Sequence, residues 1–292
     1  MLTKLIAYII ICSCIIDFSC SKKTSHGFIN TKHTEQKVII ELYTGHRDGH
    51  AVIATKKIIA EQNKHSNKII PIVIHAGFFA ITSKDYPEDL TSAITKEYFL
   101  FWKVSANPLL SINRVKRSNT PIVTYADSWW QNTADSLIKL SAVADIKISN
   151  SYSPSLRTLN TSVKYTFLKN INEPCKLVVL LTEDSVIATQ RDYSSSTTNP
   201  IQDYIHRYIL RAGITNAWGD AAEQNTVNNE TTNPNGYITK HYSYHIPEKY
   251  NNTFVKEKNC YVFVKEKNCY VVAYLYNALT YEVVQAEIKK II

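Results

Sequence analysis

Three side chains that could bind a metal ion or transfer a proton lie within five residues of one another: His46, Asp48 and His50. His75 follows an apolar run further along the chain. Imidazole and carboxylate groups are ligands that zinc and copper accept, so these four residues form a candidate metal or partner site. A competing interpretation is structural, because an aspartate before a helix caps its N-terminus and complements its dipole. The residues alone assign no metal.

The elements around these residues predict how they are positioned. Residues 37–43 (KVIIELY) form a β-branched apolar run typical of a buried strand, and residues 68–76 form a second. Between them, apolar residues at helical spacing predict a helix from His50 to Lys64. Two such strands joined by a helix predict a right-handed βαβ unit with parallel strands. Parallel neighbours end on the same side of a sheet, so His75 should approach the cluster.

The rest of the chain divides into two kinds of pattern. Helices are predicted at residues 91–102 and 128–140, with a short strand at Leu109–Ile112 between them. From about Ala144, short alternating segments separated by Asn, Pro, Ser and Thr clusters are typical of an antiparallel sandwich. We therefore expect an α/β domain at residues 37–141, followed by an all-β sandwich-like domain at residues 142–292.

The N-terminus has the features of an export signal. One lysine precedes an apolar run from Leu5 to Ile16, which is too short to cross a bilayer and fits a signal peptide. The following Phe18-Ser-Cys-Ser-Lys22 resembles a bacterial lipoprotein signal, in which the cysteine becomes the acylated first residue. We expect a signal peptide at residues 1–19, lipidation at Cys20 and a polar tether at residues 20–36. Ordinary secretion with cleavage nearby, or an uncleaved anchor, is the alternative.

Charge and cysteine usage exclude several classes of protein. The net charge is +8, but no stripe of Lys and Arg alternates with aromatic residues, so no nucleic-acid partner is expected. No phosphate-binding glycine motif or nucleophile elbow is present. Behind the predicted anchor, Cys175, Cys260 and Cys269 allow at most one internal disulfide.

One nonapeptide occurs twice in succession. FVKEKNCYV spans residues 254–262 and again residues 263–271. Nine is odd, so a single continuous strand would place Cys260 and Cys269 on opposite faces. Either the Lys-Glu-Lys-Asn segment turns the chain between the copies or one copy is extruded. We favour a duplication without function over an additional functional hairpin.

Several stretches together resemble a known family. They are residues 37–51, 72–80, 106–114, 204–213, 218–219 and 271–286. In combination and order they are similar to the outer membrane protein 28 family of lipoproteins from Bacteroidetes-type bacteria. The resemblance implies a thioredoxin-like domain followed by a β-rich domain on an envelope lipoprotein.

The resemblance also bears on the join between the first strand and helix. In many members, as in thioredoxins, this join carries C-x-x-C, and the helix N-terminus lowers the pKa of the first thiol. The matching positions here are Asp48 and Ala51, which cannot form a mixed disulfide. Pro108 matches the thioredoxin cis-proline and is a structural candidate only.

These observations lead to a functional hypothesis. The chain is expected to be a lipid-anchored outer-membrane protein, facing the periplasm or the cell surface, without enzymatic activity or cofactor. Its role would be structural, or binding to an unknown protein or glycan partner. The alternatives are a thioredoxin-related or metal-dependent enzyme acting through His46, Asp48 and His50, and a surface adhesin.

Overall fold

The computed structural model describes residues 34–66, 68–118, 120–125, 129–169, 171–194, 199–222, 237–255 and 258–292, with the backbone alone at 251–255 and 258–262. The predicted signal peptide (1–19), the lipidation site Cys20 and most of the predicted tether (20–36) lie outside the described residues. The side chain of Cys260 lies outside them as well.

The first two apolar runs form the centre of the fold. They are strands β1 (Val38–Thr44) and β2 (Ile69–His75), and every residue of both is buried. Helix α1 (Ala51–Lys64) joins them, and they pair in parallel with Thr44 opposite His75. Burial on both faces accounts for the nearly continuous apolar character of these strands. The βαβ prediction is confirmed, and both strands end at the same edge of the sheet.

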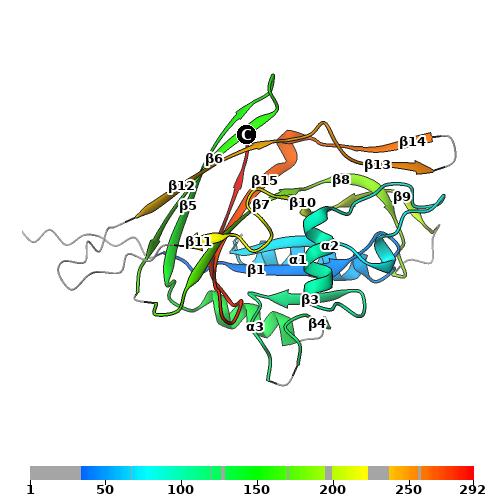
Figure 1. The fold of residues 1–292 in the computed structure, drawn as a ribbon. Helices are drawn as coiled ribbons and strands as arrows, with labels where there is room; N and C mark the ends of the chain where they lie inside the picture. Colours follow the sequence, from blue (N-terminus) through cyan, green and yellow to red (C-terminus); the bar gives the residue numbers. More distant parts are fainter. Residues whose placement is uncertain are drawn as a thin grey trace, which may run out of the picture. The chain divides into compact units, whose positions relative to one another are not determined.

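Around this pair, the described residues form a sheet of nine strands (Figure 1). The order is β16-β15-β7-β10-β2-β1-β3-β4, and β11 pairs with β7 at the side of this path. β10 lies parallel to β2, whereas β3 is antiparallel to β1 and β4 to β3. The remaining strands of this sheet are β3 (Leu109–Ile112), β4 (Thr124–Tyr125), β7 (Cys175–Glu183), β10 (Ile209–Gly213), β11 (Asp220–Ala222), β15 (Cys269–Asn277) and β16 (Val283–Lys290).

The predicted boundary between residues 141 and 142 does not interrupt this sheet. Strands β1 to β4 precede it, and β7, β10, β11, β15 and β16 follow it. The two groups join where Ile209 of β10 pairs with Val73 of β2. Residues 34–292 form one compact unit. The division into 37–141 and 142–292 therefore describes order along the chain rather than two separate sheets, and as a division into domains it stays a prediction.

Two further helices occur where the sequence predicts them. Helix α2 (Ala93–Phe101) begins at a capping box in which Ser92 and Thr95 exchange hydrogen bonds. Helix α3 (Trp129–Ile138) buries Trp130 and Ala134 in a core shared with β1 and β3. A one-turn 3-10 helix, η1 (Phe78–Ala80), follows β2.

A second sheet of three described strands packs on the first. Its order is β12-β6-β5, from β5 (Ala144–Ser153), β6 (Thr158–Phe167) and β12 (Ile238–His245). Alternate residues of β5 and β6 point inward, and they share one core with side chains of β7 and β15. Of the predicted fold class, an α/β domain followed by an all-β sandwich-like domain, the β-rich character is confirmed. The thioredoxin-like assignment of the first part stays a prediction.

The duplicated nonapeptide takes two different structures. The first copy, residues 254–262, lies across the reversal of a hairpin formed by β13 (Lys249–Val255) and β14 (Lys258–Phe263). The second copy, residues 263–271, passes through a 3-10 turn, η2 (Glu266–Asn268), and enters the central strand β15. The reversal therefore lies inside the first copy rather than between the copies. A separate hairpin is formed by β8 (Val186–Gln190) and β9 (Ile201–His206).

Two ion pairs are buried in the central sheet. Glu41 of β1 accepts a 2.6 Å hydrogen bond from Nη2 of Arg114, and the side chains are 2% and 1% exposed. Arg211 of β10 donates from Nε to Glu183 of β7 at 2.8 Å, with equally low exposure. Each pair links neighbouring segments of the core. Losing one partner would be strongly destabilising, because the other charge would stay buried without compensation.

Candidate functional site

The strand–helix join is shaped by a close approach of two backbone segments. Gly45 follows β1, and a Cβ atom at this position would lie 2.2 Å from the carbonyl carbon and oxygen of Phe79. The amide of Arg47 donates to the same Phe79 carbonyl oxygen at 2.9 Å. Glycine is therefore required for the chain to turn beneath η1 before α1 begins.

Asp48 is committed to the structure of the join. Its Oδ2 accepts a hydrogen bond from Thr44 Oγ1 at 2.8 Å, and its Oδ1 accepts one from the amide of His50 at 2.9 Å. Gln190 donates to its main-chain oxygen at 2.8 Å. Burial raises the pKa of the Asp48 carboxyl, although the bond from Thr44 acts in the opposite direction. This carboxylate stabilises the turn and is buried away from solvent.

The two histidines of the join point into different environments. His46 is fully buried, its ring stacks on Tyr86 with centroids 5.5 Å apart, and Nε2 lies 3.2 Å from the carbonyl oxygen of Ile81. Burial lowers the pKa of His46. His50 is exposed, and its ring meets that of Tyr193 edge-on at 5.2 Å. The two imidazoles do not converge.

His75 lies close enough to His46 to interact with it electrostatically, and it also contacts a further histidine, His206. Its ring lies 5.2 Å from that of His206 at the end of β9, and both residues are buried. Neither ring nitrogen of His75 has a hydrogen-bond partner within the described residues, and the same holds for Nε2 of His206. Burial lowers the pKa of His75 well below its usual range and that of His206 to about 3, so both rings are neutral. The pairing of β2 with β10 creates this contact, and no pattern in the sequence predicts it.

The candidate metal site is therefore not assembled as the sequence suggested. Among the described residues, the ligand atoms of His46, Asp48, His50 and His75 do not gather within 4.8 Å of one another, whereas those of Glu61, His65 and Asp135 do. The Asn107–Pro108 peptide bond is cis. The role of Pro108 in shaping its loop stays a prediction.

The two cysteine thiols in the described core lie away from solvent. Cys175 and Cys269 are both buried. Burial raises the pKa of the Cys269 thiol, and the nearby carboxylate of Glu183 acts in the same direction. A thiol with a raised pKa forms little thiolate, the form that attacks disulfides.

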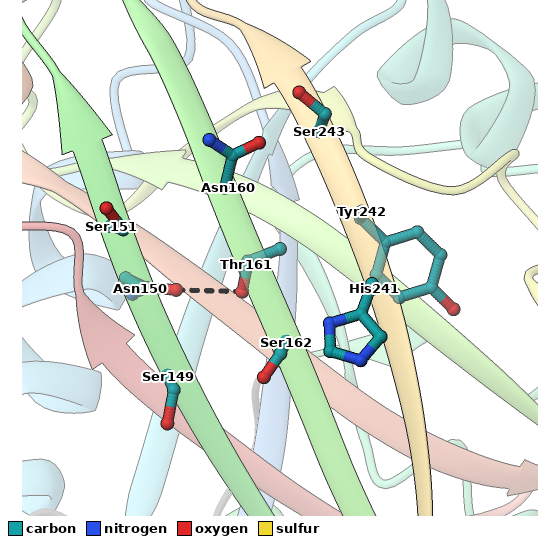
Figure 2. Close-up of a pocket in the computed structure, with 9 residues that line it drawn as sticks. All are labelled: Ser149, Asn150, Ser151, Asn160, Thr161, Ser162, His241, Tyr242 and Ser243. Atoms are coloured by element: carbon teal, nitrogen blue, oxygen red, sulfur yellow. Dashed lines mark hydrogen bonds between the residues drawn. The ribbon is translucent and has the colours of Figure 1, made fainter.

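The outer face of the β5-β6-β12 sheet carries a hollow of about 490 Å³ (Figure 2). Strand register places Ser149, Ser162 and His241 in one row across the sheet, and Ser151, Asn160 and Ser243 in the next. Between the two rows, Asn150 and Thr161 point to the opposite face of the sheet, where Thr161 donates to Oδ1 of Asn150 at 2.8 Å, as Figure 2 shows. No side-chain hydrogen bond between described residues involves the six side chains of the two rows. They present hydroxyl, amide and imidazole groups to the surface.

A second hollow of about 450 Å³ lies between α1 and β9. Its lining combines apolar side chains with one carboxylate, one ammonium group (Lys56) and one guanidinium group. These residues include Ile59, Ile201, Ile205, Asp203 and Arg207. It holds none of the candidate site residues His46, Asp48, His50 and His75.

Comparison with known proteins identifies the family to which this chain belongs. The chain is a β-rich protein whose large mixed sheet packs on a smaller antiparallel one. The family model of the outer membrane protein Omp28 matches residues 95–291, so the chain belongs to the Omp28 family. This confirms the resemblance inferred from the sequence. The match includes residues 106–114, 204–213 and 271–286 but begins after the strand–helix join.

The chain is also similar to solved structures. HBP35 of Porphyromonas gingivalis aligns with a TM-score of 0.63 and 12% identity over 88% of this chain and 75% of that one, which shows a shared fold. A domain of the outer membrane lipoprotein Omp28 from the same organism matches 51% of this chain and 88% of that one, with 18% identity and a TM-score of 0.33. A protein from Agrobacterium tumefaciens matches 89% and 96%, with 11% identity and a TM-score of 0.45. No curated protein matches the chain.

One observation concerns the membrane. No helix in the described part of the chain is long and apolar enough to cross a bilayer.

Proposed function

We propose that this chain is a lipid-anchored protein of the outer membrane whose role is binding or structural rather than catalytic. Membership of the Omp28 family supports the location in the envelope. The sequence pattern around Cys20 supports the lipid anchor. The anchor would hold the residues from Thr34 onward at the membrane surface through the polar tether.

We further propose that residues 37–141 form a thioredoxin-like domain that has lost its redox chemistry. The βαβ unit of β1, α1 and β2, followed by α2, the antiparallel strands β3 and β4, and α3, supports this assignment. The proposed loss of redox function rests on the structure of the strand–helix join. Asp48 occupies the place of a reactive thiol and uses both carboxylate oxygens to bond its own loop.

An insulin-reduction assay tests this proposal. The full chain, purified in mild detergent, should reduce insulin no faster than a control without protein, because no reactive thiolate lies at the join. Turnover well above the control would contradict the proposal and favour the thioredoxin-related enzyme.

A matched variant tests the scaffold itself. The double substitution Asp48→Cys/Ala51→Cys restores C-x-x-C at the join and should yield a disulfide between positions 48 and 51, detected by alkylation and mass spectrometry. If the two new thiols stay reduced under mild oxidation while the protein remains folded, the join does not have thioredoxin geometry.

A second candidate function is adhesion to a neutral glycan through the outer face of the β5-β6-β12 sheet. Ser, Asn and His side chains offer both donors and acceptors, as sugar hydroxyl groups do, and the two rows contain no Lys, Arg, Asp or Glu. An array of immobilised neutral glycans tests this function with the full chain. Asn160→Arg should abolish binding, whereas Asn132→Arg on the exposed surface of α3 should preserve it.

The side of the membrane decides between these roles. Protease treatment of intact cells, followed by immunodetection beside a periplasmic control, gives the answer. Loss of the protein from intact cells favours the adhesin. Protection until the membrane is opened favours a partner in the periplasm.

A further inference from the structure

We infer that Glu61, His65 and Asp135 form a binding site for a divalent transition-metal ion between helices α1 and α3. Glu61 lies in the last turn of α1, His65 follows its end, and Asp135 lies in the middle of α3. One ligand atom from each of the three residues lies within 4.8 Å of the others. This site is separate from the strand–helix join and from both hollows.

The three side chains lie close enough together to bind one ion after small movements. His65 Nε2 lies 2.7 Å from Asp135 Oδ1 and 3.3 Å from Glu61 Oε2. In tetrahedral zinc sites, with bonds of about 2.0–2.1 Å, neighbouring ligand atoms are about 3.4 Å apart. Glu61 and His65 are separated by one helical turn, so both side chains lie on the same face of α1.

The chemistry of the three groups also fits a metal ion. Imidazole with two carboxylates is a nitrogen and oxygen donor set that suits zinc. His65 Nε2 is shielded from solvent and faces Asp135 Oδ1 at 2.7 Å. Gln131 donates to the other oxygen of Glu61 at 3.0 Å and holds that carboxylate in place. Such outer contacts orient the ligands of metal sites.

Lys64 competes with a metal ion for the same carboxylates. Its Nζ lies 3.2 Å from Glu61 Oε2 and 3.4 Å from Asp135 Oδ2. The side chain is 53% exposed, so it can move into solvent when a dication takes its place. The ammonium group therefore weakens metal binding without blocking it, and its removal should strengthen binding.

Zinc titration of the full chain tests this site. The protein is purified in mild detergent, stripped with EDTA, and studied by equilibrium dialysis against zinc chloride and by thermal unfolding. Wild type should bind one zinc ion per chain and unfold at a higher temperature with zinc, because a ligand that binds only the folded state stabilises it. His65→Ala should lower the affinity by roughly tenfold or more, since it removes the nitrogen ligand.

Two further variants complete the test. Lys64→Met should raise the zinc affinity several-fold by removing the competing charge. His245→Ala, at the exposed end of β12, should leave the affinity unchanged. Equal zinc binding by wild type and a folded His65→Ala protein would overturn the proposal. If His65→Ala fails to fold, an unchanged affinity in Lys64→Met would overturn it as well.

Discussion

The strand–helix join and the outer face of the β5-β6-β12 sheet carry similar polar side chains and use them in opposite ways. At the join, Asp48 bonds its own loop and His46 is fully buried. On the sheet face, Ser151 and Asn160 are exposed, and no hydrogen bond of their side chains joins them to another described residue. His46 and Asp48, which the sequence singled out, thus support the fold, whereas serine and asparagine side chains on the sheet face remain available to a ligand.

The two regions also differ in the exposure of their ion pairs. Beneath the join, the Glu41–Arg114 pair is almost completely withdrawn from water. On the sheet face, Lys147 pairs with Asp145 at 3.4 Å while its side chain is 72% exposed. An ion pair in water contributes little to stability, but a buried one cannot lose a partner without a large penalty. The two regions should therefore respond very differently to substitution.

The largest effect is expected at the buried pair. Arg114→Leu leaves the Glu41 carboxylate buried without its cation and should lower the free energy of unfolding by about 3–5 kcal/mol. Urea unfolding followed by circular dichroism measures the change. Lys147→Ala on the sheet face is the control and should cost less than about 1 kcal/mol. Similar losses in both variants would remove the contrast between the two regions.

A smaller effect is expected from one added methyl group at the join. Gly45→Ala places Cβ against the backbone of Phe79, which cannot rotate away, and should destabilise the protein by about 1–3 kcal/mol. Ser151→Ala on the sheet face alters a side chain of similar size and should stay within about 0.5 kcal/mol of wild type. A neutral Gly45→Ala would mean that the join is less tightly packed than its contacts indicate.

Acid should weaken the region beneath the join through its buried histidines. A base whose pKa is lower in the folded state than its unfolded value of 6.5 binds fewer protons when folded, so its stabilising contribution is present above pH 6.5 and is lost as the pH falls. For His206, with a pKa of about 3, this loss should amount to about 1.4 kcal/mol per pH unit between these limits.

Unfolding free energies between pH 7.5 and 5 check this expectation. His206→Gln should show a shallower pH dependence than wild type. Ser243→Ala, on the exposed sheet face, removes no titratable group and should leave the curve unchanged. A wild-type curve that is flat down to pH 5 would contradict the prediction.

The smallest change in stability is expected on the sheet face itself. The double substitution Ser151→Ala/Asn160→Ala should alter the free energy of unfolding by less than about 0.5 kcal/mol per site, because neither side chain bonds another described residue. Any glycan binding should nevertheless fall in the same variant. Unchanged binding to every glycan that the wild type recognises would remove this face from the adhesin proposal.

Much of the local structure could be predicted from the sequence. The strand predicted at Leu109–Ile112 is β3 with the same bounds, and the βαβ unit follows the apolar runs and helical spacing. These features depend on periodicity and β-branched content, which a short window of sequence contains. The family could also be recognised, because its stretches keep their order along the chain.

The sites could be predicted less well, because they depend on distant pairings. His75 was expected to approach the cluster of His46, Asp48 and His50. It interacts electrostatically with His46, but the parallel contact of β2 with β10 also places it against His206, which the sequence did not indicate. Likewise, Glu61 and His65 meet Asp135 only because α1 and α3 pack together. Residues 70 or more positions apart carry no mutual signal in a single sequence.

The duplicated FVKEKNCYV shows this limit most directly. The sequence determined that both copies favour β-structure around a polar Lys-Glu-Lys-Asn turn. Only the tertiary structure decided that the first copy forms a hairpin reversal while the second supplies Cys269 and Val271 to the buried strand β15. The physical reason is that β15 pairs along its whole length with β7 and also with β16, and these partners can hold only one strand between them. The two identical copies therefore adopt different structures, because different partner strands are available to each of them.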